Sequence, residues 1–293
     1  MQSSPVHPVK TPGPATVMLR AGLSRGVIEL RQSFTNGGDL WNHLFWPVLM
    51  LGVTFYLRDD TFGESGLLLG TLALPGILGM NVAVGMIVMS QHLTADREDG
   101  TLLRVKATPN GMPGYLLGKI VTVSGSLIAD LAIFLVPGML LVDGLAVTGA
   151  DAWLTLLWVL ALGLLAALPV GAVLGSAFTS VRAQGLLTLP TLALIGISGI
   201  FYPLTSLPGW LQWTAQVFPF YWLGLGMRSA LLPHSAVTVE IGDSWRHLET
   251  VGVLGAWAAL GLAVAPVVLR RMARHESGSR VAQRRERALQ RVG

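Results

Sequence analysis

Residues 67–90 read LLLGTLALPGILGMNVAVGMIVMS, and residues 96–109 read DREDGTLLRVKATP. The first stretch carries no charged side chain, whereas the second is a dense run of charges that ends in Thr108 and Pro109. A helix of roughly 20 apolar residues crosses the hydrocarbon of a membrane, which is about 30 Å thick. The two stretches together therefore predict a membrane-spanning helix that ends in a charged loop, where a soluble partner can dock.

The composition extends the membrane assignment to the whole chain. Of the 293 residues, 52% are hydrophobic and only 12% are charged, and the mean hydropathy is +0.60. This leaves too little polar material to cover a soluble globule of that size. We therefore predict an all-α membrane protein with six transmembrane helices, at residues 40–57, 67–90, 115–142, 153–180, 185–204 and 250–269.

The positions of Lys and Arg predict the orientation, because positively charged loops stay on the cytoplasmic side of a membrane. Six spans place both termini on one side. All but three of the 20 Lys and Arg residues fall on that side, the exceptions being Arg58, Arg228 and Arg246. We therefore predict that both termini and the charged loop face the cytoplasm.

The segment before the first span has the pattern of an amphipathic helix lying in the membrane surface. Its apolar side chains recur three or four residues apart, at Leu19, Leu23, Val27, Leu30 and Phe34. The alternative is a helix that packs only on other protein. The residues before Leu40 lack the compact apolar core of a secretory signal, so we expect the N-terminus to be retained.

The sequence shows no chemistry of its own. It has no cysteine, and its six histidines are scattered without metal-ligand spacing. Pro113 and Ile120 stand where a phosphate-binding loop needs Gly and then Ser or Thr. We therefore predict no catalytic residue, no metal site and no cofactor on this chain. The basic tail 270–293 supplies most of the net charge of +4, which anionic lipid explains without nucleic acid.

The charged loop has the pattern of a short docking helix. Acids among residues 96–99 place negative charge early and bases among residues 104–106 place positive charge late, as the helix dipole favours. The apolar side chains Leu102, Leu103 and Val105 offer a surface that fits a groove on a partner. The alternative is an ordinary solvated loop held by its own ion pairs.

Two segments resemble the signatures of ABC-2 type transporter permeases. The charged loop, continuing through YLLGK at residues 115–119, matches that family's acidic-R-E-x-G-T-L opening, its Thr-Pro turn and its Leu-Gly-Lys start of the third span. The stretch SGIFYPL at residues 198–204, continuing to Arg228, resembles its fifth span and the short external helices that follow. The departures are Asp96, where Glu is commoner, and Leu103, where a charged residue is usual.

The resemblance covers essentially the whole chain and implies a permease subunit of a bacterial exporter. Such a subunit lies in the plasma membrane as a multi-pass protein and pairs with a second permease chain, identical or homologous. Two separate ATP-binding cassette subunits supply ATP and Mg, so the chain itself is not an enzyme. Its domains are then the N-terminal segment 1–39, the permease domain 40–269 and the basic tail 270–293.

The resemblance also implies site residues within that permease domain. The cytoplasmic coupling loop spans residues 92–113, and its predicted ATPase-coupling residues are Asp96, Arg97, Glu98, Gly100, Thr101, Leu102 and Arg104. The external cap spans residues 205–247, over an outer gate predicted at Phe201, Tyr202, Pro203, Pro208 and Trp210. The aromatics of the cap fit the membrane–water interface, and a plain interfacial belt without gating is the alternative.

Asp130 is the acid that falls inside a predicted span, and such a group normally faces a partner or a wet cavity. We predict Asp130 and Asn81 as possible substrate-path residues, with a structural hydrogen-bonding role for Asp130 as the alternative. Small residues at 167, 171, 175 and 179 predict close helix packing in the fourth span.

The predicted function is export of a hydrophobic or amphipathic molecule, either a drug or antibiotic or a lipid-like compound, because the spans are apolar and carry few charges. A glycan or polysaccharide precursor is the alternative cargo within the family. From another class, an ion-coupled secondary transporter or a channel needs several ionisable groups within the membrane or an inverted repeat. The sequence shows neither.

Overall fold

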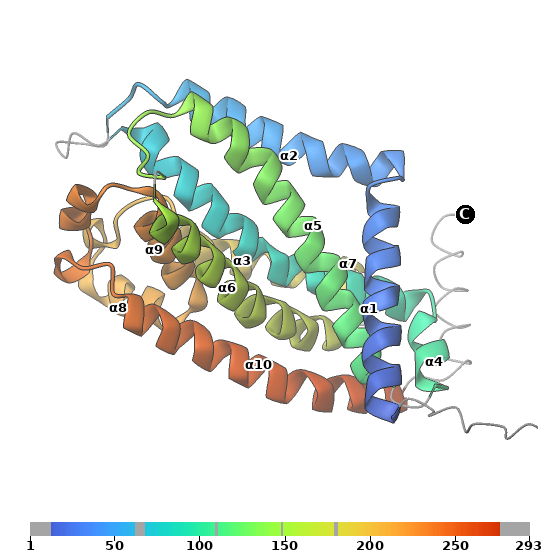
Figure 1. The fold of residues 1–293 in the computed structure, drawn as a ribbon. Helices are drawn as coiled ribbons and strands as arrows, with labels where there is room; N and C mark the ends of the chain where they lie inside the picture. The colour runs from blue at the N-terminus through green and yellow to red at the C-terminus, as the bar shows by residue number, and fades with distance from the viewer. Residues whose placement is uncertain (1–12, 62–67, 109–110, 148, 179–180, 276–293) are drawn as a thin grey trace, which may run out of the picture.

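The computed structural model describes residues 13–61, 68–108, 111–147, 149–178 and 181–275. These residues form helices joined by short loops, with one isolated bridge between Thr61 and Leu68 and no strand among them. The all-α fold class is confirmed (Figure 1). The helices are α1 (Pro14–Ser33), α2 (Gly37–Tyr56), α3 (Leu69–Glu98), α4 (Thr101–Lys106), α5 (Gly111–Leu141), α6 (Ala150–Ser176), α7 (Val181–Gly196), α8 (Gly209–Val217), α9 (Pro219–Leu231) and α10 (His247–His275), with 3-10 turns at Leu204–Ser206, His234–Val239 and Ile241–Asp243.

Within the described residues, four helices are long and apolar enough to cross a membrane, namely α3, α5, α6 and α10. They coincide with four of the six predicted spans. The other two predicted spans fall on α2 and α7. The first half of α2 carries the polar residues Asp39, Asn42 and His43, and α7 is only 16 residues long. Membrane crossing by these two helices stays a prediction.

α3 lies at the centre of the bundle and packs on α5, α6, α7 and α9. Small residues bring α6 against it. A Cβ added at Gly171 would clash with the backbone of Met86, and one added at Gly175 would lie 2.8 Å from the Cα of Ser90. The small-residue ridge of the fourth predicted span therefore packs on a neighbour in the same chain. Thr179, its last member, lies outside the described residues.

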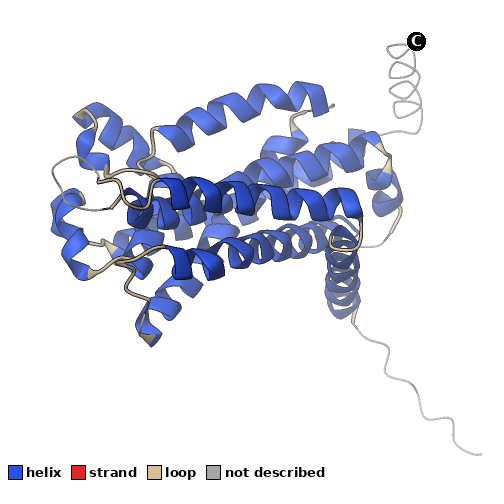
Figure 2. Cartoon of the chain, turned by 90° about the horizontal axis from the view of Figure 1, so that it is seen from above, coloured by secondary structure: helices blue, strands red, loops and turns tan. Residues whose placement is uncertain are grey.

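α1 runs across the ends of the bundle helices, whereas the long helices themselves run side by side (Figures 1 and 2). Its Gly22 and Gly26 are buried against α5. Its apolar stripe stays open: Leu19 and Leu23 are each 47% exposed and Val27 is 56% exposed. α1 thus packs on protein through its glycines and still presents an apolar face. Its place in the membrane surface stays a prediction.

The segment between α7 and α10 has an exposed part and a buried part. On α8, Trp210 and Trp213 are 69% and 76% exposed. On α9, the side chains of Phe220, Tyr221 and Trp222 are buried, and the helix packs on α3, α6 and α10. The prediction of one aromatic belt at the membrane–water interface is therefore wrong for α9, whose aromatics belong to the core.

Ser206 does not cap α8, although serine is among the preferred N-cap residues of helices. The helix begins at Gly209 with Pro208 as its N-cap, without a side-chain cap. Ser206 instead donates its hydroxyl hydrogen bond to the carbonyl of Pro203, 2.9 Å away. The hydroxyl is used by the 3-10 turn that precedes the helix, which is why it caps nothing.

Candidate functional site

Gly100 separates the charged loop into two helices. Its φ of +75° lies in the left-handed region that favours glycine, and it forms the N-cap of α4. Asp96 and Glu98 therefore stand at the C-terminal end of α3, where the helix dipole disfavours carboxylates. The predicted dipole arrangement is wrong for these acids. The predicted dipole arrangement is correct for Arg104 and Lys106, which lie in the last turn of α4.

α4 turns two of its apolar side chains inward, onto α3, α5 and α10. Leu102 is 1% exposed and Val105 is 8% exposed, and both belong to the core of the chain. The predicted apolar docking surface is therefore corrected, because these two side chains are already covered by their own protein. Arg104 is exposed and hydrogen-bonds through Nη2 to the hydroxyl of Thr101, 3.3 Å away.

Lys119 joins three helices in a buried ionic network with Glu29, Asp96, Tyr115 and Arg25, which we call the junction. Its Nζ lies 2.8 Å from Glu29 Oε2 on α1 and 2.9 Å from Asp96 Oδ2 on α3. The Tyr115 hydroxyl donates to Asp96 Oδ2 at 2.7 Å. The Lys119 side chain, on α5, is only 6% exposed. The predicted coupling residue Asp96 is thus held inside the chain.

Arg25 completes the junction on α1. Its Nε donates to Glu29 Oε1 at 2.8 Å, and its guanidinium lies 5.2 Å from the centre of the Tyr115 ring. Burial alone raises the pKa of the Glu29 carboxyl, but the hydrogen bonds and charges of Lys119 and Arg25 outweigh burial and hold that pKa below its usual value. Glu29 therefore stays ionised, and its contribution to stability is lost only as the pH falls through this lowered pKa.

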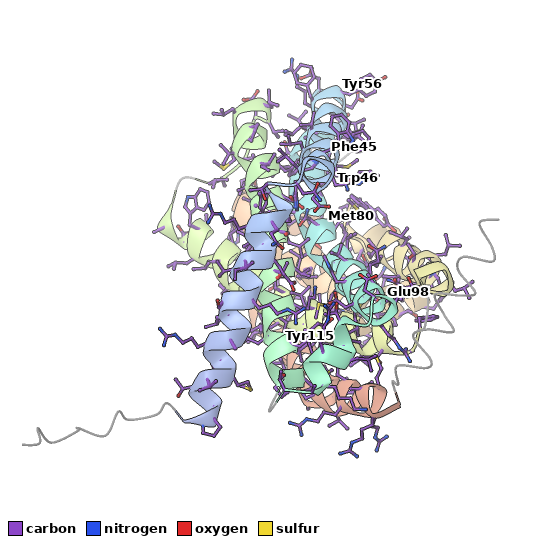
Figure 3. The ribbon with its side chains drawn as sticks, turned by 90° about the vertical axis from the view of Figure 1, so that its right-hand side faces the viewer. Phe45, Trp46, Tyr56, Met80, Glu98 and Tyr115 are labelled. Atoms are coloured by element: carbon purple, nitrogen blue, oxygen red, sulfur yellow. The ribbon has the colours of Figure 1, made fainter. Side chains whose placement is uncertain are left out.

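Arg97 extends the contacts of this end of α3 to α6. Its Nη1 donates to the carbonyls of Ser176 at 3.2 Å and Phe178 at 2.8 Å, at the C-terminal end of α6. Those carbonyls have no partner within the helix, so the guanidinium satisfies them. Of the predicted coupling residues, Asp96, Arg97 and Leu102 thus hold the loop to the bundle. Figure 3 shows Glu98 and Tyr115 at this end of the bundle.

A groove of about 600 Å³ opens beside the junction, between α1, α4 and α5. Val17, Met18 and Val105 give it apolar walls, and Arg25 and Arg104 line it as cations. Its lining therefore combines apolar surface with positive charge next to the charged loop.

A second cavity, of about 470 Å³, lies between α2, α3, α5 and α7. We call it the membrane cavity. The structure brings both predicted substrate-path residues, Asn81 and Asp130, to its wall, which is otherwise mostly apolar. Asp130 Oδ1 lies 2.6 Å from His43 Nδ1 on α2. Asp130 therefore makes a hydrogen-bonding contact and also lines the cavity. Its role in a substrate path stays a prediction.

The predicted outer-gate residues divide into two groups. Phe201, Tyr202 and Pro203 form one turn after Gly199, whose φ is +69°, and the Tyr202 hydroxyl donates to the carbonyl of Gly196 at 2.7 Å. Pro208 and Trp210 belong to the start of α8 and are exposed. The five predicted gate residues therefore do not form one local structure.

Arg228 holds that turn from within the protein. Its Nη1 donates to the carbonyls of Gly199 at 2.9 Å and Ile200 at 3.1 Å, and its Nε donates to Glu240 Oε1 at 2.6 Å. Both charged side chains are 1% exposed. From the sequence we placed Arg228 among the external charges and did not predict its pair with Glu240. The signal that could have indicated a buried partner was a charged residue within an apolar segment.

Comparison with family models gives a match over residues 60–266 to the model described as ABC-2 family transporter protein. A search of curated proteins gave no match. The matched range includes the charged loop, the turn held by Arg228 and the walls of the membrane cavity that α3, α5 and α7 supply. It covers well over half of the chain. The chain therefore belongs to the ABC-2 transporter family, as a membrane transport permease.

Proposed function

We propose that this chain is the permease subunit of an ATP-driven exporter in a bacterial plasma membrane. It works with a second permease chain and with two ATP-binding cassette subunits that hold ATP and Mg and carry the ATPase activity. Both termini face the cytoplasm, on either side of the permease domain 40–269. Most of the basic tail lies outside the described residues.

The observation that carries this proposal is that the same two helices, α3 and α5, connect the charged loop to the membrane cavity. α3 and α5 bear Asp96 and Lys119 at the junction, and the same helices supply Asn81 and Asp130 to the membrane cavity. A force applied at the charged loop therefore reaches the cavity walls through continuous helices. In the proposed cycle, closure of the ATPase subunits tilts α3 and α5 and opens a route toward the external segment.

The groove between α1, α4 and α5 supports docking of an ATPase subunit. It lies against the loop that resembles the coupling element, and the sequence lacks a phosphate-binding loop of its own. A partner segment with apolar and acidic side chains fits its walls and its two arginines. The exposed Arg104 then contacts the partner, while Leu102 positions α4.

The lining of the membrane cavity favours a hydrophobic or amphipathic substrate, such as a drug, an antibiotic or a lipid-like compound. Pockets for such ligands are mainly apolar with a few placed polar groups. A glycan precursor needs many hydrogen-bonding partners, which this lining does not offer. Among the described residues that line the cavity, Asp130 is the one ionisable group. Ion-coupled transport is therefore less well supported.

The test is transport in inside-out membrane vesicles that contain the chain with its host's ATPase subunits. We expect ATP-driven uptake of a fluorescent amphipathic dye, with no uptake when a non-hydrolysable ATP analogue replaces ATP. We also expect the tagged chain to purify as a complex that hydrolyses ATP. Uptake that is indifferent to ATP, together with a purified chain devoid of ATPase activity, would sink the exporter proposal.

A further inference from the structure

The membrane cavity has a lining that bears on the charge of its ligand. Among the described residues around it, the one ionisable side chain is the acid Asp130, and neither Lys nor Arg lines the wall. Its volume of about 470 Å³ lies within the range of roughly 300–1,000 Å³ that is usual for drug-sized ligands. A ligand that enters therefore meets one acid, which His43 contacts on one oxygen, and no Lys or Arg in the described wall.

Two residues of the cavity wall, Asn81 and Asp130, each have a side-chain oxygen without a donor among the described residues. Asn81 Oδ1 is buried and has no partner in the described structure. His43 occupies Asp130 Oδ1 at 2.6 Å, and within the described part of the chain no donor is paired with Oδ2. A buried acceptor without a donor is unfavourable, so a ligand N–H that reaches Asn81 Oδ1 gains a hydrogen bond. Asp130 is only partly buried, with its side chain 19% exposed, so its second oxygen is accessible to a cationic group.

The aromatic residues of the cavity also favour a cationic ligand. Trp46 on α2 and Phe134 on α5 both line the cavity, and aromatic faces attract cations. Figure 3 shows Trp46 above Met80 of α3, which also lines the cavity, on one side of the molecule. Methionine adapts to ligands of different shape. The wall thus offers apolar contact around the two acceptors.

Other ligand charges fit less well. An anionic group would face Asp130 without a cation from the wall. A neutral apolar ligand would leave Asn81 Oδ1 unpaired. If Asp130 served only to hold His43, the position of Asn81 Oδ1 on the same wall would have no explanation.

We infer that the membrane cavity binds an organic cation, namely a protonated amine on an apolar body. The ammonium group lies against the Asp130 carboxylate, and Asn81 Oδ1 accepts its N–H. This inference rests on the proposed function, because it names the substrate class of the cavity which that function assigns to transport.

The test measures binding to the full chain in lipid nanodiscs without any ATPase. Two dansyl probes share a butyl linker, one ending in a dimethylammonium group and the other in an isopropyl group of the same shape. We expect the native chain to bind the amine probe about tenfold more tightly, as a hydrogen bond to a charged group allows. Asp130→Asn removes this preference by weakening only the amine probe.

Two further variants sharpen the result. Asn81→Leu weakens the amine probe several-fold and leaves the isopropyl probe unchanged. Asp143→Asn removes the charge of an exposed acid just after α5 and changes neither affinity. Unchanged isopropyl binding shows that a variant cavity is intact. If Asp130→Asn abolishes binding of both probes, the result for Asn81→Leu becomes the test. Equal weakening of both probes by Asn81→Leu then overturns the inference.

Equal binding of the two probes by the native chain, or a preference that survives Asp130→Asn, also overturns the cation site. The proposed function fails separately. Vesicles that show no ATP-driven transport would overturn the exporter and leave the binding result standing. ATP-driven uptake of both probes with equal affinity would support the exporter and overturn the cation site.

Discussion

Lys119 is the residue that holds the junction together. It lies between the carboxylates of Glu29 and Asp96, which come from different helices. Both acids are partly buried, with side-chain exposures of 23% and 17%. Without the ammonium group, two carboxylates would face each other across a small, poorly solvated space. Removing one partner of such a network costs more than the network itself contributes.

We expect Lys119→Met to lower the free energy of unfolding by about 2 kcal/mol, which is a drop of about 5 °C in Tm for a chain of this size. The measurement is thermal unfolding in detergent. Lys106→Met makes the same chemical change at an exposed position of α4 and is expected to shift stability by less than about 0.5 kcal/mol.

Adding Glu29→Gln to Lys119→Met should restore part of the loss, because it removes one of the two unpaired charges. A Tm for Lys119→Met equal to that of Lys106→Met would show that the network contributes nothing to the fold.

At the residue scale, the sequence indicated which polar residues matter better than it indicated which residues they contact. Asn81 and Asp130 were singled out because polar groups are rare in apolar spans, and the structure brings both to one cavity. The junction was missed because Lys119 and Glu29 are 90 residues apart in the chain. No local pattern relates them, and only the crossing of α1 over α5 brings them together.

At the element scale, the contact of α1 with α5 depends on paired glycines. A Cβ added at Gly26 would lie 2.7 Å from the Gly118 carbonyl oxygen and 2.8 Å from Val121 Cβ. At Gly22 the nearest atom would be the Gly114 carbonyl oxygen, 2.6 Å away. The two backbones are therefore in direct contact, and a larger residue on α1 must push the helices apart.

We expect Gly26→Leu to destabilise the protein by about 2 to 3 kcal/mol through overpacking, and to lower ATP-driven uptake because α1 no longer braces the junction. The matched control is Gly52→Leu in α2, where an added Cβ meets nothing within 4 Å. That change should be neutral or slightly stabilising, because leucine is the better helix former.

Thermal unfolding of the two variants compares them directly. If Gly26→Leu is as stable as Gly52→Leu, then α1 does not pack on α5 as described.

The positions of α3, α5, α6 and α10 followed from long apolar runs in the sequence, although α3 and α10 extend beyond the predicted spans. The burial of α9 did not follow. Its composition resembles an interfacial segment, but Gly226 lets it approach Val159 of α6, and Gly224 faces Gly79 of α3. Burial of this kind is a property of distant partners, which a local count of aromatics does not register.

At the scale of the whole molecule, the junction lies near one end of α3 and α5, and the membrane cavity lies along the middle of the same two helices. The outside of α2 carries large apolar side chains, with Phe45, Trp46 and Tyr56 exposed at 41%, 59% and 83% (Figure 3). In a membrane, lipid or the proposed second permease covers such a surface. In the proposed mechanism, the chain receives force at its charged loop and holds a ligand within the bundle.

The most direct measurement is ATP-driven uptake by inside-out vesicles that carry Glu98→Lys together with Arg104→Glu. These side chains stand on either side of Gly100, at the end of α3 and on α4. The control, Arg58→Glu with Asp59→Lys, reverses an exposed pair in the loop after α2. We predict the normal amount of membrane-inserted chain and unchanged uptake in the control. In the charged-loop variant we predict that uptake falls about tenfold or more, because charge complementarity with the ATPase is lost. Uptake by the charged-loop variant at the native rate would contradict the coupling role of the charged loop.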